Sequence, residues 1–70
     1  MAEDSVYKVV ELVGTSTESW EMAAETAINR AAKTLDDLRI AEVADLDLII
    51  DDGKVTAYRA KVKLSFKYKG

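Results

Sequence analysis

The chain has 70 residues, of which 49% are hydrophobic and 33% charged, so it is expected to form one globular domain over residues 1–70. It contains neither cysteine nor histidine, which excludes disulfides, thiolate nucleophiles, imidazole bases and zinc sites built from these residues. No apolar run approaches the roughly 18 residues of a membrane span, and residues 1–5 are acidic, so we expect a cytoplasmic protein with no membrane partner. A chain this small buries only about 60% of its unfolded surface, and self-association is the expected way to complete its core.

Charge is distributed unevenly along the chain, whose formal net charge is −3. Residues 1–53 hold all 13 acidic residues and four of the ten basic ones, whereas residues 54–70 hold six basic residues and no acidic one. Such asymmetry is typical either of a surface for nucleic acid or acidic lipid, or of two halves that fold against each other.

The first half of the sequence predicts a strand followed by a helix. Valine-rich residues 6–13 favour a strand, which Gly14 is expected to end. Glu18 follows Thr15 by three residues, as in a capping box, so a helix should begin there and stop near residues 36–38. Its predicted apolar stripe comprises Trp20, Ala24, Ala27, Ile28, Ala31 and Leu35. The alanines in this stripe permit close approach to a sheet.

Two alternating segments in the second half predict a long β-hairpin. The first places one set of residues toward a core: Ile40, Glu42, Ala44, Leu46, Leu48 and Ile50. The second segment, residues 54–69, is apolar on one face at Tyr58, Ala60, Val62, Leu64, Phe66 and Tyr68, and mainly basic on the other. A two-residue turn at Asp52–Gly53 would mix these faces. The prediction is therefore a three-residue loop, residues 51–53, which sets Leu46 opposite Tyr58 and Asp45 opposite Arg59.

This hairpin accounts for the uneven charge. Asp45 and Asp47 fall beside Arg59 and Lys61 on one face, where cross-strand ion pairs help to set the register. Three lysines are left without a predicted partner and are available to an anion: Lys63, Lys67 and Lys69. Together the elements predict an α+β domain with the order β-α-β-β.

The sequence contains few residues with the spacing of a catalytic, phosphate-binding or metal-binding motif. Neither a lysine nor a carboxylate is placed to activate a Ser or Thr, so the protein is not expected to be an enzyme. Gly14-Thr15-Ser16 lacks the other glycines and the lysine of a phosphate loop, which favours simple capping. Aspartates 45, 47, 51 and 52 do not have the spacing of an EF-hand, so they are interpreted first as solvated turn acids. Nucleic-acid binding is disfavoured because Tyr58 and Phe66 lie on the face opposite the lysines.

Several short segments, in this order, resemble one family over nearly the whole chain. They are Glu11-Leu12-Val13-Gly14-Thr15-Ser16, the alanine-rich helix, Ala41-Glu42-Val43, Tyr58 and Phe66. The sequence is similar to the dodecins. The resemblance implies a three-stranded antiparallel sheet wrapped around one helix, and a hollow homo-dodecamer that binds flavins in stacked pairs between subunits.

The flavin contacts of that family are altered in this chain. The resemblance places Ile40 where the flavin-binding members carry a stacking tryptophan, and Arg59 where they carry a glutamine. Loss of one aromatic stacking contact is expected to weaken flavin binding roughly ten- to a hundredfold. Arg59 instead offers a fork suited to carboxylate or phosphate, with Asp45 as its expected neighbour. The candidate cofactor-binding residues are therefore Ile40, Asp45 and Arg59.

The branch called calcium dodecins is more similar still, in Ser5-Val6-Tyr7-Lys8-Val9, Ser19-Trp20-Glu21 and Ser65-Phe66-Lys67. This resemblance favours the hypothesis that the protein binds a divalent cation. The candidate metal ligands are Glu42, Asp45 and Asp47, with the Asp36-Asp37 pair as a further candidate. The expected function is a non-enzymatic hollow dodecamer that binds or buffers calcium or an anionic small ligand. One alternative is a flavin-storage dodecin for riboflavin, FMN or FAD with altered contacts. The others are a ligand-free structural oligomer or a basic-sheet nucleic-acid binder.

Overall fold

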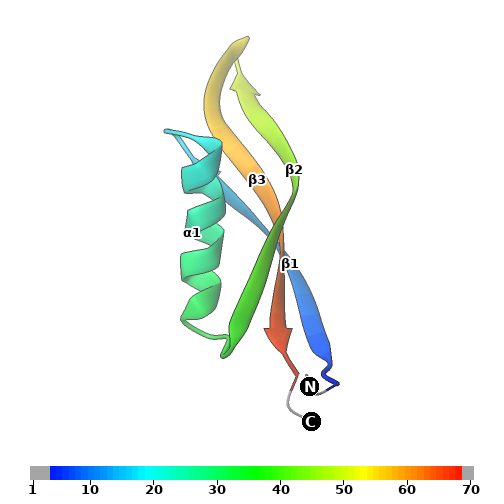
Figure 1. Cartoon of the computed structure of the whole chain (residues 1–70). Coiled ribbons are helices and arrows are strands. Elements are labelled where there is room, and N and C mark those ends of the chain that lie inside the picture. The colour runs from blue at the N-terminus through cyan, green and yellow to red at the C-terminus, as the bar shows by residue number, and fades with distance from the viewer. Residues whose placement is uncertain (1–3, 69–70) are drawn as a thin grey trace.

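The computed structural model describes residues 4–68 as one helix packed on a three-stranded sheet (Figure 1). The elements, in chain order, are β1 (Tyr7–Ser16), α1 (Trp20–Ala32), β2 (Leu38–Asp51) and β3 (Lys54–Lys67). The sheet order is β1-β3-β2, and both pairings are antiparallel. The predicted β-α-β-β order and α+β class are therefore confirmed. At 13 residues, α1 is too short to cross a membrane, and the part of the chain that the structure describes has no candidate span.

The core lies between α1 and β3, the central strand. Its fully buried residues are Ala23, Ala27 and Ala31 from the helix and Ala60, Val62 and Leu64 from the strand. Alanines four residues apart form one face of a helix, and their small side chains let it approach the sheet closely. The apolar face predicted for β3 is confirmed at these three buried positions. In the helix, Ala23 joins the predicted stripe, whereas Trp20 lies at its rim and is 37% exposed.

Gly14 does not end the first strand, contrary to the prediction. β1 continues through it to Ser16, with Gly14 opposite Ala60 on the side that faces the helix. A Cβ at Gly14 would lie 2.0 Å from the carbonyl oxygen of Ala23. The glycine is therefore required by the close approach of α1, rather than by a turn.

Ser19 caps the helix, so the predicted capping box at Thr15 was wrong. The Ser19 Oγ accepts a hydrogen bond of 3.0 Å from the backbone N–H of Met22. Ser16, the last residue of β1, instead accepts from the N–H of Glu18 and shapes the connection. The helix ends at Ala32 with Lys33 as its C-cap, a turn earlier than predicted. Asp37, which precedes β2, has a left-handed φ of 60°.

The hairpin closes with two central residues instead of the predicted three. Asp52 and Gly53 have φ values of 51° and 75°, as the central positions of a type I′ turn require, and Asp51 lies opposite Lys54. Thr56 then forms a bulge as an extra residue in β3, and its Oγ1 donates to the carbonyl of Ile49.

The bulge supplies the residue that the turn lacks, so both faces of the hairpin remain consistent although the predicted pairing was wrong. Leu46 lies opposite Ala60 rather than Tyr58, and Leu48 lies opposite Tyr58. Arg59 consequently lies opposite Asp47 and not Asp45.

Two further bulges, with Arg39 and Ala44 as the extra residues, change the faces of β2. Val43 and Leu46 both lie on the helix side, opposite the buried Val62 and Ala60. Ile40 and Glu42 pair with Ser65 and Lys63 and lie on the other face. The prediction that they share the core-directed face was wrong, because uninterrupted alternation does not allow for an extra residue.

The molecule is elongated, because the hairpin extends past the helix (Figure 1). Its principal extents are 53 × 20 × 17 Å and its radius of gyration is 14.5 Å, against about 11 Å for a compact domain of this length. Its accessible surface of 5405 Å² exceeds the roughly 4,300 Å² typical of a monomer of this mass.

Candidate functional site

The sheet face that points away from α1 carries most of the predicted site residues. Facing residues on paired strands project to the same side, so the register defines this outer face. It comprises Tyr7, Val9, Glu11, Val13 and Thr15 of β1, Arg59, Lys61, Lys63, Ser65 and Lys67 of β3, and Ile40, Glu42, Asp45, Asp47 and Ile49 of β2. All five candidate cofactor and metal residues, Ile40, Glu42, Asp45, Asp47 and Arg59, therefore share one surface.

Basic residues of the central strand are matched by acidic residues on the outer face. Along β2, Asp47 lies opposite Arg59 and Asp45 opposite Lys61. Lys63 has a glutamate on each side, Glu11 of β1 and Glu42 of β2. Opposite charges in facing positions favour this register, and they confirm that the uneven charge of the sequence arises from strands that pair.

The available lysines differ from those predicted. Lys63 lies between two carboxylates rather than apart from acids. Lys67 is exposed and lies opposite Tyr7, and its backbone N–H donates to the carbonyl of Asp37. Lys69, the third predicted anion ligand, lies outside the described residues.

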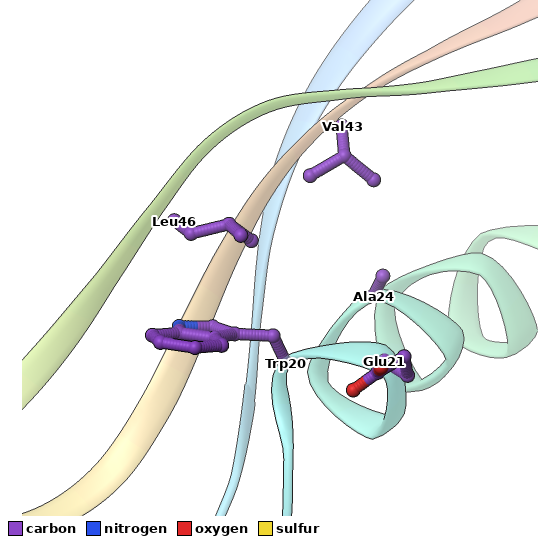
Figure 2. A pocket seen from close by; sticks show the side chains of 5 residues that line it. All are labelled: Trp20, Glu21, Ala24, Val43 and Leu46. Carbon is purple, nitrogen blue, oxygen red and sulfur yellow. The ribbon is translucent and has the colours of Figure 1, made fainter.

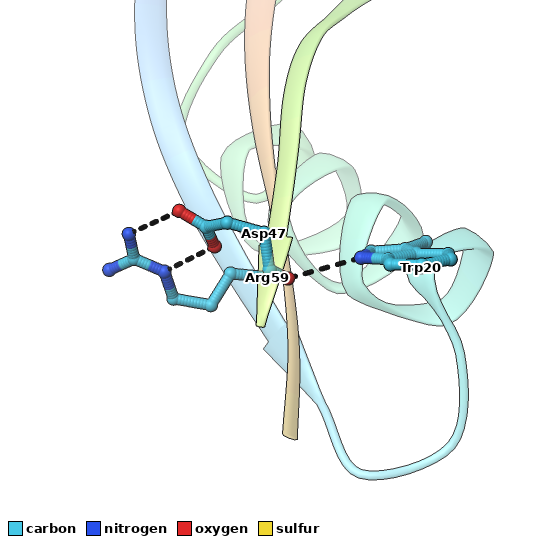
Figure 3. A network of polar contacts seen from close by, with 3 residues as sticks. All are labelled: Trp20, Asp47 and Arg59. Atoms are coloured by element: carbon cyan, nitrogen blue, oxygen red, sulfur yellow. Dashed lines mark hydrogen bonds and ion pairs between the residues drawn. The ribbon is translucent and has the colours of Figure 1, made fainter. Parts of the chain in front are cut away.

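Arg59 and Asp47 form a bidentate ion pair on the outer face (Figure 3). The Arg59 Nε donates to one carboxylate oxygen of Asp47 and the terminal nitrogen Nη2 to the other, each at 2.7 Å. These hydrogen bonds, followed by charge attraction from Arg59 and Lys61, hold the pKa of the Asp47 carboxyl below its ordinary value. The same pairing raises the pKa of Arg59. Both carboxylate oxygens are thus occupied by charged donors.

Trp20 connects the helix to the same position of β2 from the other side of the sheet. Its indole Nε1–H donates to the backbone carbonyl of Asp47 at 3.1 Å (Figure 3). The indole also meets the ring of Tyr58 edge-on, with centroids 5.3 Å apart and an interplanar angle of 73°. The predicted packing role of Trp20 omitted this hydrogen bond. It joins residues 27 positions apart, a separation that no local pattern in the sequence indicates.

A shallow apolar cavity opens on the helix side of β2, beside Trp20 (Figure 2). It has a volume of about 220 Å³ and is lined by Trp20, Glu21, Ala24, Val43 and Leu46. Ile40 borders a smaller cavity of about 150 Å³ with Ile28 and Leu38. The Ile40 side chain, which the sequence resemblance places where a stacking tryptophan was expected, is 56% exposed.

The candidate metal ligands lie on the same stretch of β2, but their carboxylates do not converge on one point within a single described chain. Glu42, Asp45 and Asp47 occupy successive paired positions of β2 on the outer face. Within residues 4–68 of one chain, no three acidic side chains converge closely enough to hold a metal ion. The Asp36-Asp37 pair is in the α1–β2 connection, where Asp37 lies 3.7 Å from the guanidinium of Arg39.

Comparison with known proteins places this geometry in a family. Residues 6–69 match the dodecin family, and the chain belongs to it. The calcium dodecin of Mycobacterium tuberculosis (strain ATCC 25618 / H37Rv) is 50% identical over 64 residues, which cover 90% of this chain and 89% of the relative. The resemblance seen in the sequence is thereby confirmed.

Solved structures agree with the fold. The structure of dodecin from Streptomyces coelicolor superposes with a TM-score of 0.90 at 33% identity, covering 99% of both chains. A crystal structure of the Mycobacterium tuberculosis calcium dodecin, described as calcium chelating and as having a novel calcium-binding site, has a TM-score of 0.82 at 47% identity and covers 93% of both chains.

Proposed function

We propose that this protein is a non-enzymatic dodecin that assembles into a hollow homo-dodecamer and binds calcium through carboxylates of its outer face. The similarity to the calcium dodecin of Mycobacterium tuberculosis, whose structure is described as holding a calcium-binding site, is the observation that carries the choice of ligand. The dodecameric state is what membership of the dodecin family implies.

The shape of the chain supports assembly. Its surface exceeds that of a typical monomer of this mass by roughly 1,000 Å², which is comparable to the roughly 800 Å² that one partner contributes to a standard protein interface. A two-stranded hairpin by itself is only marginally stable in water. The tip of this hairpin nevertheless extends beyond α1, where the helix does not cover it (Figure 1).

Apolar side chains on the hairpin are the surface that neighbouring copies would cover. Leu46, Leu48, Ile50 and Val55 lie on the helix side by their register, and they are 50%, 40%, 66% and 53% exposed. A contiguous exposed apolar surface on a small protein marks an interaction site. Only six hydrophobic side chains are buried within the described part of one chain. Burial of the exposed hairpin side chains against neighbouring copies would enlarge this small core.

Calcium fits the donors that the outer face offers. Calcium takes six to eight oxygen ligands, and the candidate ligands Glu42, Asp45 and Asp47 are all carboxylates. One chain brings too few of them to one point. Symmetry in a closed oligomer places the same carboxylate from several copies around one axis, so the proposed site is shared between chains.

Native mass spectrometry at low micromolar concentration tests the assembly. The expected species is about twelve times the 7.7 kDa chain, and a folded species of one chain would overturn the proposal. Leu48→Asp should shift the population toward smaller species, because it places a charge on the exposed apolar surface. Thr17→Asp, an exposed change in the β1–α1 connection, serves as the matched control and should leave the mass unchanged.

Calorimetric titration of the chelator-treated oligomer with calcium chloride tests the ligand. Glu42→Gln combined with Asp45→Asn should abolish the heat, whereas Asp51→Asn with Asp52→Asn removes the same charge at the hairpin turn and should retain it. No heat in the parent protein would refute calcium binding. Quenching of riboflavin fluorescence would then favour the flavin alternative, and salt-sensitive heparin retention would favour nucleic acid.

A further inference from the structure

The ion pair between Asp47 and Arg59 has a consequence for ligand selection on the outer face. Both oxygens of the Asp47 carboxylate accept from the same guanidinium at 2.7 Å. A cation that binds Asp47 must therefore compete with the charge of Arg59, and an anion that binds the fork of Arg59 must displace Asp47. Each residue is already occupied by the other.

We propose that Asp47 and Arg59 are the selectivity-determining pair of the outer face, each acting as an internal competitor for the ligand of the other. The cation half of this inference rests on the proposed calcium binding, whereas the anion half does not depend on it. Binding of calcium at Asp47 releases Arg59, so calcium and a phosphate-bearing ligand should assist each other. By linkage, that assistance is equal in both directions.

The residues around the ion pair define what changes when Arg59 separates from Asp47. The backbone carbonyl of Asp47 accepts a hydrogen bond from the Trp20 indole, so the backbone of β2 keeps this contact when the Asp47 and Arg59 side chains separate. Arg59 lies on the central strand, beside Lys61 at the next outer-face position. A released guanidinium therefore adds to an existing basic neighbour, and two adjacent cations are a suitable site for phosphate oxygens.

Solvent exposure sets the expected size of the competition. The side chains of Arg59 and Asp47 are 41% and 49% exposed, so water and salt weaken the pair. Removal of the competitor should strengthen binding about two- to fivefold, rather than by orders of magnitude. Trp20 is the one tryptophan of the chain. Because its indole donates to the backbone carbonyl of Asp47, a change in tryptophan emission is the expected signal of ligand binding at Asp47.

Two arms of titration on the assembled protein test the inference. In the first, calcium chloride is titrated into the parent, into Arg59→Gln and into Arg30→Gln, which removes the same charge from the exposed face of α1. The expected result is about two- to fivefold tighter calcium binding in Arg59→Gln, with a change in Trp20 emission, and unchanged affinity in Arg30→Gln. Equal affinity in the two variants would overturn the cation half while leaving calcium binding intact.

In the second arm, pyrophosphate is titrated into the parent, Asp47→Asn and Asp51→Asn. Asp47→Asn frees Arg59 and should bind pyrophosphate at least about twofold more tightly than Asp51→Asn, which loses the same charge at the turn. Equal binding by the two variants would overturn the anion half. Absence of calcium binding in both the parent and Arg59→Gln would overturn the proposed function and the cation half together, and circular dichroism confirms that each variant is folded.

Discussion

The carbonyl oxygen of Ala23 lies where a side chain on Gly14 would begin, 2.0 Å from the position of a Cβ. Helix and strand meet here backbone to backbone, at a point where both residues are buried. The position of α1 over the sheet is therefore fixed by the absence of a side chain.

Gly14→Ala should destabilise the protein by about 3 kcal/mol, the upper end of the range for overpacking. The obstructing atom belongs to the backbone of the helix and cannot rotate away, so α1 must shift as a unit. Urea unfolding at fixed protein concentration measures the loss. Thr15→Ala, which changes the exposed neighbour on the outer face, should cost under about 0.5 kcal/mol, and an equal cost for both variants would contradict the account of Gly14.

Ser19→Ala should lower the free energy of unfolding by about 1 kcal/mol. The substitution leaves the backbone N–H of Met22 without its side-chain acceptor at the start of α1. Ser19→Asp keeps an acceptor and adds a favourable charge at the N-terminus of the helix, so it should retain the stability of the parent. Thermal unfolding of the three proteins provides the comparison, and a Ser19→Asp variant as unstable as Ser19→Ala would argue against capping.

Gly53→Ala should destabilise the hairpin by about 1 kcal/mol, because a Cβ is strained at a φ of 75°. The site itself is open, with no heavy atom within 4 Å of a Cβ, so the cost comes from conformation alone. Asp52→Asn should be tolerated, since asparagine adopts a left-handed φ readily. Denaturant midpoints separate these effects, and a neutral Gly53→Ala would be incompatible with the two-residue turn.

The Asp47 carboxyl should titrate at lower pH in the parent than in Arg59→Gln, because the guanidinium favours the ionised form. Its folded-state pKa lies below the unfolded value of about 3.9. The stabilisation from the pair is therefore fully present above that value and is lost as the pH falls through the folded-state pKa. Carbon-detected NMR titration of Asp47 gives the midpoints directly. An identical midpoint in Arg59→Gln would show that Arg59 does not cause the shift.

Much of the fold follows from alternation in the sequence, because burial of one sheet face leaves a period of two. The buried set of β3, centred on Val62, could be predicted in this way. The length of the hairpin turn could not be predicted in this way. A three-residue loop and a two-residue loop followed by a bulge of one residue in the strand give the same alternation of apolar residues. The structure places that residue at Thr56, and the pairing of Arg59 moved from Asp45 to Asp47 as a result.

The start of the helix shows another limit of local patterns. Residues 15–19 include four hydroxyl side chains, and each is an acceptable cap. β1 pairs with β3 as far as Ser16, and Ser19 is the residue that caps α1. The candidate site residues could be chosen by charge and family resemblance, but their gathering on one face depends on the bulge at Ala44, which alternation does not reveal.

That single inserted residue has a further consequence for how this family of chains can vary. Because Ala44 takes up one position without a partner, Glu42 and Asp45 point the same way although they are three positions apart in the sequence. A chain shortened by this alanine would regain regular pleating with Val43 still opposite Val62 and Asp45 still opposite Lys61, so the acids would stay on the outer face and Leu46 on the helix side. If Ala44 were instead taken into the ladder as a paired residue, every β2 side chain on one side of it would change face, so the acids keep to one surface only while this small residue is left out of the pairing.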